Sequence, residues 1–202
     1  MNREKIIEKV SEFVGEKRLI HILGTETECK RLAEIFSLSG EETEKLKVAA
    51  LLHDITKGFS VKEHCEYMEK IGREFSEENL KSEKTLHAIT GAFMAKELFS
   101  ELADDLVFSA ILFHTTGKED MSLPQKLLYL ADYIEPNRTF KDCVELRKYF
   151  YDRIENEDRE KVLDDTLTLS FDLTISDLIK NGCIIHSDTV KARNYLVSHK
   201  KT

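Results

Sequence analysis

The sequence is poor in the residues that break regular structure. Its 202 residues include only eight glycines and two prolines. That scarcity argues against a turn-rich β architecture and, together with abundant Glu, Lys, Leu and Ala, favours helices. The four cysteines are far apart and form no CxxC pair. They predict reduced thiols rather than a disulfide framework or a zinc knuckle.

Long apolar runs and an excess of positive charge are also missing. No apolar run approaches the length needed to cross a bilayer, and the first residues, MNREKIIEKVSEF, lack the apolar core of a signal peptide. The formal net charge of −8 disfavours nucleic-acid binding, because phosphate neutralisation needs clustered Lys and Arg. We therefore expect a soluble cytoplasmic protein that binds neither a membrane nor nucleic acid.

What the sequence has in quantity is helical periodicity. Apolar residues recur at helical spacing almost throughout, with no repeat or domain linker. Ser39 with Glu42, and Ser122 with Gln125, predict capping boxes at the start of two helices. The first of these helices should end near Lys57-Gly58. The length suits one large core, so we predict an all-α, single-domain helical bundle over residues 1–202. Further helices are expected around 60–71, 84–101, 103–114, 141–156, 158–180 and 188–199.

Several histidines and aspartates lie on otherwise apolar helix faces. The pair His53-Asp54 ends the run AALLHD, Asp132 lies within LLYLADYI, and His21 and His114 continue apolar stripes. Burying such groups unpaired is costly, and a metal cation satisfies imidazoles and carboxylates directly. Taken singly, each is more simply a hydrogen-bonded core residue, and Asp132 could pair with an arginine such as Arg138. Together, in the order H…HD…H…H…D, they predict a metal site.

The contexts of these residues resemble a known family. The matching stretches are KRLIHILG around His21, AALLHDITKG around His53-Asp54, LHAITGA around His87, ILFHTTG around His114 and KLLYLADYIEPNR around Asp132. They are similar to the HD-domain phosphohydrolases, and more narrowly to the symmetrical diadenosine tetraphosphate hydrolases of the YqeK type. The segments HTTG and ADYIEPNR are much more specific than the HD pair itself. The resemblance extends roughly from residue 17 to 197.

The resemblance implies an HD-type helical domain, with the motif core at about 17–135 and C-terminal helices at 141–199 packed on it. It implies that one metal binds to His21, His53, Asp54 and Asp132. His87 and His114 either bind a second ion or contact the substrate phosphates. The implied metal is iron, as one or two ions. Ligand type alone would also allow manganese or another divalent metal, such as zinc.

The activity implied by the resemblance is metal-dependent symmetrical hydrolysis of diadenosine tetraphosphate to two ADP. Asp54 would orient the attacking water or take its proton, and Lys57 would stabilise charge on the phosphates. The other substrate contacts expected are Arg18, His87, His114, Thr115, Thr116, Gly117 and Arg138.

Alternative functions stay open at this point. One is another nucleotide phosphohydrolase on the same scaffold, such as a nucleotidase or a guanosine tetraphosphate hydrolase. Others are a nucleotide-sensing protein without turnover and a helical interaction protein without metal. The sequence does not fix adenine against guanine, and hence ADP against GDP as product, or the oligomeric state, which leaves a homodimer open. We expect His64, His186 and His199 to be surface or structural residues, and Arg147 to pair with Glu145 or another nearby carboxylate.

Overall fold

The computed structural model describes residues 2–200, which form eleven α-helices, one short 3-10 helix and no strand. In chain order the elements are α1 (Arg3–Ser11), α2 (Glu16–Ile35), α3 (Gly40–Leu52), α4 (Val61–Lys70), α5 (Glu77–Lys81), η1 (Glu83–Thr85), α6 (Leu86–Leu98), α7 (Asp105–Phe113), α8 (Leu123–Ile134), α9 (Lys141–Ile154), α10 (Arg159–Lys180) and α11 (Ser187–Ser198). The all-α prediction is confirmed. Over the same described residues, no helix has both the length and the apolar character of a membrane span.

Local sequence determines where several helices begin. The predicted capping box at Ser39 is present, with the Ser39 hydroxyl accepting from the Glu42 N–H and the Glu42 carboxylate accepting from the Ser39 N–H. At the start of α8, the Gln125 side chain accepts from the Ser122 N–H at 2.8 Å. A third box, Ser76 with Asn79, opens α5 in a stretch where no helix was expected.

Helix α3 is shorter than predicted. It ends at Leu52, and residues 53–58 continue as tight turns in place of the last helical turn expected before Gly58. The backbone bonds there run three residues back, from Ile55 to Leu52 and from Lys57 to Asp54. This tightening is common where an α-helix ends. It leaves the pair His53-Asp54 at the end of the helix.

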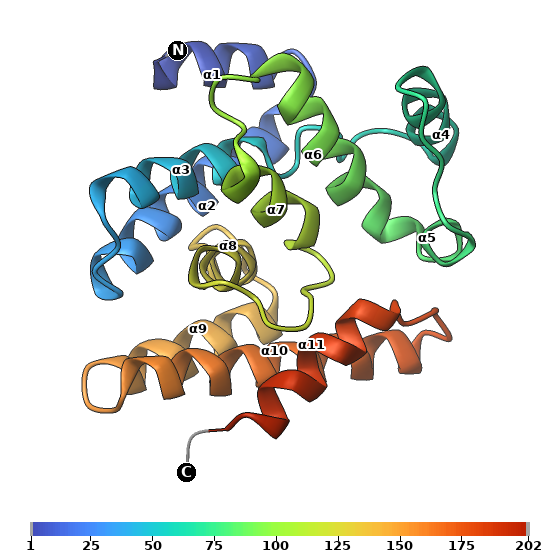
Figure 1. Cartoon of the computed structure of the whole chain (residues 1–202). Coiled ribbons are helices and arrows are strands. Elements are labelled where there is room, and N and C mark those ends of the chain that lie inside the picture. The colour runs from blue at the N-terminus through green and yellow to red at the C-terminus, as the bar shows by residue number, and fades with distance from the viewer. Residues whose placement is uncertain (1, 201–202) are drawn as a thin grey trace.

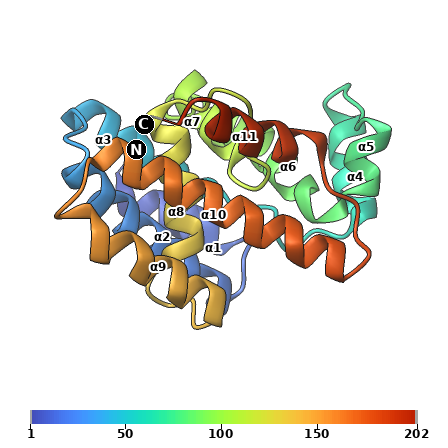
Figure 2. The same cartoon turned by 90° about the horizontal axis from the view of Figure 1, so that it is seen from below.

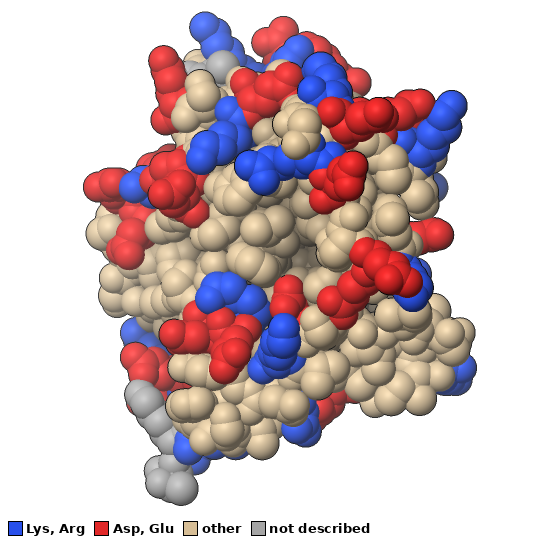
Figure 3. Space-filling view, turned by 45° about the vertical axis from the view of Figure 1, so that its right-hand side comes forward, with Lys and Arg blue, Asp and Glu red and all other residues tan. Residues whose placement is uncertain are grey.

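The helices pack around one buried hydrophobic cluster that runs along the chain from Ile6 to Leu196. Helix α2 packs along α3, both contact α8, and α7 contacts α3, α6 and α8. Helices α9 and α10 pack on α8, and α11 packs on α10, so that these last three helices form a layer on one side of α8 (Figures 1 and 2). The face shown in Figure 3 mixes Lys and Arg with Asp and Glu, and no broad area of one sign appears on it.

Candidate metal centre

Six side chains predicted from the sequence meet in the interior, and we call them the His–Asp cluster: His21, His53, Asp54, His87, His114 and Asp132. They come from α2, the end of α3, α6, the end of α7, and α8. Five of them are at most 8% exposed, and the Asp132 side chain is 19% exposed. Within the described residues they form three overlapping triads, in each of which the nitrogen and oxygen atoms lie within 4.8 Å of one another.

Two histidines of the His–Asp cluster are oriented by the helices that they end. His53 follows α3 and His114 follows α7, and in each the Nδ1 atom lies 2.7 Å from a carbonyl oxygen three residues earlier, that of Ala50 or Ile111. A carbonyl can only accept, so Nδ1 carries the proton and donates it. The Nε2 atom of each ring is then unprotonated in the neutral form and faces the cluster, which is the form in which histidine binds a metal.

His21 is oriented by Glu135, which the sequence analysis missed. The Nδ1 atom of His21 lies 3.2 Å from Glu135 Oε1, and Glu135 also accepts from the Asn137 N–H at 2.7 Å. The approach depends on Gly24 in α2, because a Cβ there would lie 2.2 Å from Glu135 Oε2 and 2.6 Å from Asn137 Nδ2. The available signal was the position of Glu135 in the segment ADYIEPNR, three residues after Asp132.

Asp54 connects the two halves of the His–Asp cluster. Its Oδ2 atom lies 3.7 Å from His21 Nε2 and 3.5 Å from His53 Nε2. Its Oδ1 atom lies 3.2 Å from His87 Nε2 and 3.7 Å from His114 Nε2. Each carboxylate oxygen therefore faces a different pair of imidazoles.

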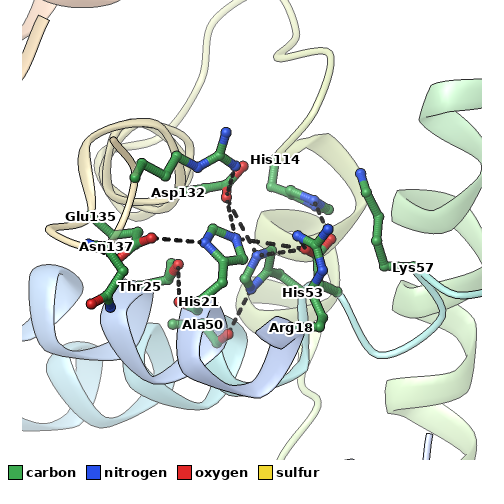
Figure 4. Close-up of polar contacts among 12 residues, drawn as sticks. Arg18, His21, Thr25, Ala50, His53, Lys57, His114, Asp132, Glu135 and Asn137 are labelled. Atoms are coloured by element: carbon green, nitrogen blue, oxygen red, sulfur yellow. Dashed lines mark hydrogen bonds and ion pairs between the residues drawn. The ribbon is translucent and has the colours of Figure 1, made fainter. Parts of the chain in front are cut away.

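Two nitrogens of the His–Asp cluster lack hydrogen bonds. Among the described residues, the buried Nε2 atoms of His21 and His53 have no hydrogen-bond partner. Asp132 Oδ1 lies 2.8 Å and 3.6 Å from them, but no aligned hydrogen bond forms. Buried polar atoms in native proteins rarely stay unpaired. The carboxyl ends of α3 and α7, which point here, also favour positive charge. These residues suit a divalent cation (Figure 4).

The protonation states of Asp54, Asp132 and His87 fit the same conclusion. Burial by itself lowers the pKa of His21, but Asp132 and Glu135 raise it to about 9, so a cation that binds this ring must displace a proton. Burial by itself raises the pKa of Asp54, but His53, His114 and His87 hold it well below its ordinary value. For Asp132, burial is likewise outweighed, mainly by Arg138 and His21. Burial lowers the pKa of His87 to about 3, so its ring is neutral. Ionised carboxylates and neutral imidazoles are the metal-binding forms.

Three cations border the His–Asp cluster. Arg18 Nη1 lies 2.7 Å from Asp54 Oδ2, Arg138 Nη2 lies 2.7 Å from Asp132 Oδ1, and Lys57 Nζ lies 3.0 Å from His87 Nε2. With His21 they line a hollow of about 1090 Å³, which we call the basic groove. Figure 4 shows Arg18 and Lys57 beside the histidines. An anionic substrate would find both positive charge and the cluster there.

Within residues 2–200, Arg147 forms no ion pair with Glu145 or another carboxylate, so that prediction was wrong. Its guanidinium donates to three main-chain carbonyls, those of Ile134, Glu135 and Arg138, at 2.6, 2.5 and 2.9 Å. These carbonyls lie at the end of α8 and just after it, where a carbonyl has no partner within the helix. Arg147 thus holds in place the segment that carries Glu135 and Arg138.

The three residues after His114 differ in what they contact. Thr115 Oγ1 lies 3.2 Å from His114 Nε2 and 3.3 Å from His87 Nε2, as a site residue would. Thr116 instead donates to the carbonyl of Gly117. Gly117 has φ +64°, and a Cβ there would lie 2.6 Å from the Phe171 ring. Thr116 and Gly117 therefore serve the turn that leads out of α7 rather than the His–Asp cluster.

His64 and His186 are structural residues, in line with expectation. His64 is buried, with its Nδ1 atom 2.8 Å from Thr90 Oγ1. His186 Nδ1 accepts from the Asp188 N–H at the start of α11. Neither belongs to the His–Asp cluster.

Comparison with known proteins places this arrangement in a family. The family model of the HD domain matches residues 18–137, which include all six residues of the His–Asp cluster. The chain is 34% identical to a symmetrical bis(5'-nucleosyl)-tetraphosphatase of Bacillus subtilis (strain 168), covering 98% of this chain and 99% of the relative. A protein with the same name from Halalkalibacterium halodurans is 31% identical over the full length of both chains.

A crystal structure from Clostridium acetobutylicum, described as a predicted HD superfamily hydrolase involved in NAD metabolism, is similar in fold. It is 37% identical, 99% of each chain is covered, and the TM-score is 0.85. The chain belongs to the HD-domain family and, within it, to the group of proteins named symmetrical bis(5'-nucleosyl)-tetraphosphatase.

Proposed function

We propose that this chain hydrolyses dinucleoside tetraphosphates such as diadenosine tetraphosphate at the central bridge, releasing two nucleoside diphosphates, with the help of a bound divalent metal. The observation that carries the proposal is the pair of buried Nε2 atoms of His21 and His53, which face Asp54 and Asp132 without an aligned hydrogen bond. The names of the full-length relatives support the substrate and the position of cleavage.

His21, His53, Asp54 and Asp132 would hold the metal. His87 and His114, on the other side of Asp54, would take a second ion or contact the phosphates. When bound, the metal would lower the pKa of water and polarise a phosphoryl oxygen. We propose iron for this position, with manganese as a substitute, although imidazole and carboxylate ligands do not themselves select between them.

The protein side chains position and neutralise the substrate. Water attacks a phosphorus atom beside the central bridging oxygen and gives up a proton to the solvent. The bond from that phosphorus to the bridge breaks, and the bridging oxygen leaves with the bonding electrons on the second diphosphate. Asp54 has a strongly lowered pKa, so it orients the water by accepting hydrogen bonds and is a poor permanent proton acceptor. Arg18, Lys57 and Arg138 would stabilise the charge that develops on the phosphates.

The test is a product analysis with protein whose metal content is measured as isolated. Metal-loaded protein should convert diadenosine tetraphosphate to ADP alone. Appearance of ATP with AMP would exclude symmetrical cleavage. A parallel panel of mononucleotides and guanosine tetraphosphate tests the other phosphohydrolase activities, and no turnover of any of them by fully loaded protein would favour a sensor. The cytoplasmic location expected from the sequence is part of the same proposal.

A further inference from the structure

A series of buried hydrogen bonds lies behind one half of the His–Asp cluster. The Nδ1 atom of His64 lies 2.8 Å from Thr90 Oγ1, which in turn lies 2.9 Å from Thr56 Oγ1. The Thr56 hydroxyl then donates to the main-chain carbonyl of His87 at 2.9 Å. All four residues are at most 4% exposed. We call these three contacts the His64 network.

The His64 network joins three segments that are separate in sequence. His64 belongs to α4, Thr90 and His87 belong to α6, and Thr56 lies in the tight turns of residues 53–58. Helix α4 packs on α6 (Figure 1). The network therefore runs from an outer helix, across α6, to the turns that follow α3.

Only one assignment of protons satisfies all three contacts. A carbonyl can only accept, so the single hydroxyl proton of Thr56 points at the His87 oxygen. Thr90 must then donate to Thr56, and His64 Nδ1 must donate to Thr90. The Leu86 carbonyl, at 3.2 Å, is the more distant acceptor for the Thr90 proton. The His64 network thus has a direction, and it requires the Nδ1–H form of His64.

Gly91 allows α6 to approach the same turns closely. A Cβ at this position would lie 3.3 Å from the His53 carbonyl oxygen and 3.5 Å from Thr56 Oγ1. Without that side chain, the Thr56 hydroxyl reaches the main chain of α6 directly. The spacing between the turns and α6 is therefore fixed by a short contact between main chain and hydroxyl.

This spacing sets the geometry of one half of the His–Asp cluster. Asp54 and Lys57 come from the turns, and His87 comes from α6. Asp54 Oδ1 lies 3.2 Å from His87 Nε2, and Lys57 Nζ lies 3.0 Å from the same atom. In the other half, His21 is oriented by Glu135, which takes no part in the His64 network. The two halves therefore have separate supports.

We propose that the His64 network positions Asp54, Lys57 and His87 for the reaction. Its own side chains are positioning groups, which act through the spacing between the turns and α6. The proposal rests on the proposed function, in which those three groups face a second ion or the substrate phosphates. A misplacement of about 1 Å can lower a rate by about a hundredfold, so loss of the network should be visible in kcat.

The central hydroxyl is tested by Thr56→Val, which removes it at nearly constant shape, and by Thr56→Ser, which keeps it. For diadenosine tetraphosphate, T56V should lower kcat by about tenfold or more, whereas T56S should stay within about threefold of the wild type. Thr27→Val is the matched control, because that hydroxyl donates to the Leu23 carbonyl on an exposed part of α2. Folded T56V with an unchanged kcat would overturn the proposal, even if its melting temperature fell.

The far end of the His64 network gives a second test, which decides the matter if T56V does not fold. His64→Leu removes the donor, whereas His64→Asn offers an amide N–H in place of Nδ1–H. H64L should lower kcat by about three- to tenfold and H64N by less than twofold. An H64L protein with the kcat of the wild type would contradict the proposal.

A double-mutant cycle shows whether the contacts act together. In the T56V background, H64L should cause little further loss of kcat, because the series of hydrogen bonds is already broken. Losses that simply multiply would mean that His64 and Thr56 act separately, against the proposal.

NMR of the histidine side chains separates this proposal from the proposed function, because it needs no turnover. With diamagnetic zinc in place of iron, the wild type should show His64 in its Nδ1–H form, and T56V should shift the ring signals of His87 but not those of His21. That result supports the His64 network even in a protein that hydrolyses no dinucleotide. His64 in the Nε2–H form, in a protein that does hydrolyse the dinucleotide, would reject the network and leave the function standing.

Discussion

The His–Asp cluster and the distal pocket lie side by side but are built in different ways. The cluster consists of charged and polar side chains, several of them fixed by hydrogen bonds to carbonyls or carboxylates. The distal pocket is the hollow of about 410 Å³ beside η1. Its lining is mixed, with two aliphatic side chains, several threonines, two lysines and the unpaired hydroxyl of Ser82. The proposed chemistry therefore depends on a few side chains that hydrogen bonds hold in fixed positions.

The largest expected loss of activity comes from substituting Asp54, because this residue faces both halves of the His–Asp cluster. Asp54→Asn should lower kcat by about a thousandfold or more, since metal-assisted charge stabilisation is worth several kcal/mol, and should reduce the metal content. Steady-state kinetics and elemental analysis measure both. Asp105→Asn, whose side chain is fully exposed, serves as the control. Near-normal activity of D54N would remove the centre of the proposed mechanism.

A smaller effect is expected from Gly24→Ala. The new side chain would contact Glu135, which orients His21, and none of the proposed metal ligands themselves. The added Cβ must displace Glu135 from His21. Loss of such a supporting contact typically lowers metal affinity by about 10- to 100-fold. Competition with a chelator measures it. Gly40→Ala is the matched control, because nothing lies within 4 Å of a Cβ there. Equal affinities for the two variants would show that Glu135 does not support the site.

Thr115 borders both regions, so its substitution should have a small effect on catalysis. Thr115→Val should lower kcat/KM by about three- to tenfold, the worth of one neutral hydrogen bond, with unchanged metal content. The comparison is Thr116→Val, which should leave kcat/KM within about twofold because that hydroxyl donates to the carbonyl of Gly117. If T116V were the more damaging change for catalysis, the assignment of these two residues would have to be reversed.

The smallest expected effect is on the pH dependence of stability. It comes from His64, which lies outside both regions. Burial lowers the pKa of His64, so the folded protein holds it neutral. Its contribution to stability is complete above its unfolded pKa of about 6.5 and is lost as the pH falls below that value. Between pH 7 and 5, the free energy of unfolding should fall less for His64→Gln than for the wild type. The two slopes against pH should differ by at most the equivalent of one bound proton. Urea titrations at several pH values measure it, and parallel curves would contradict the pKa shift.

The two regions also differ in how far the sequence predicted them. The buried His53 and the partly buried Asp132 interrupt apolar helix faces, so their positions could be found from periodicity alone. Ser82 is one serine among many, and its unpaired hydroxyl is visible only once α5 and α11 are placed. Glu135 was missed for a related reason, since its partner His21 is more than a hundred residues away in sequence.

Local signals predicted the helices well where they were strong. The capping boxes at Ser39 and Ser122 were found because serine is followed by Glu or Gln three residues later. The box at Ser76 uses Asn79, a weaker signal, and α5 was missed. The early end of α3 could not be read from AALLHDITKG, which continues the helical pattern past Leu52. The single-domain organisation and the role of each site residue stay predictions.

The three hydrogen bonds that Arg147 donates to main-chain carbonyls limit how short a functional fragment of the protein can be. This arginine lies beyond residue 137, where the match to the HD family ends. A shortened protein that stopped there would retain every proposed metal ligand in its sequence and yet leave those carbonyls without the arginine that donates to all three. The minimal unit is thus larger than the motif-bearing segment, because α9, which carries Arg147, stabilises the segment that follows α8.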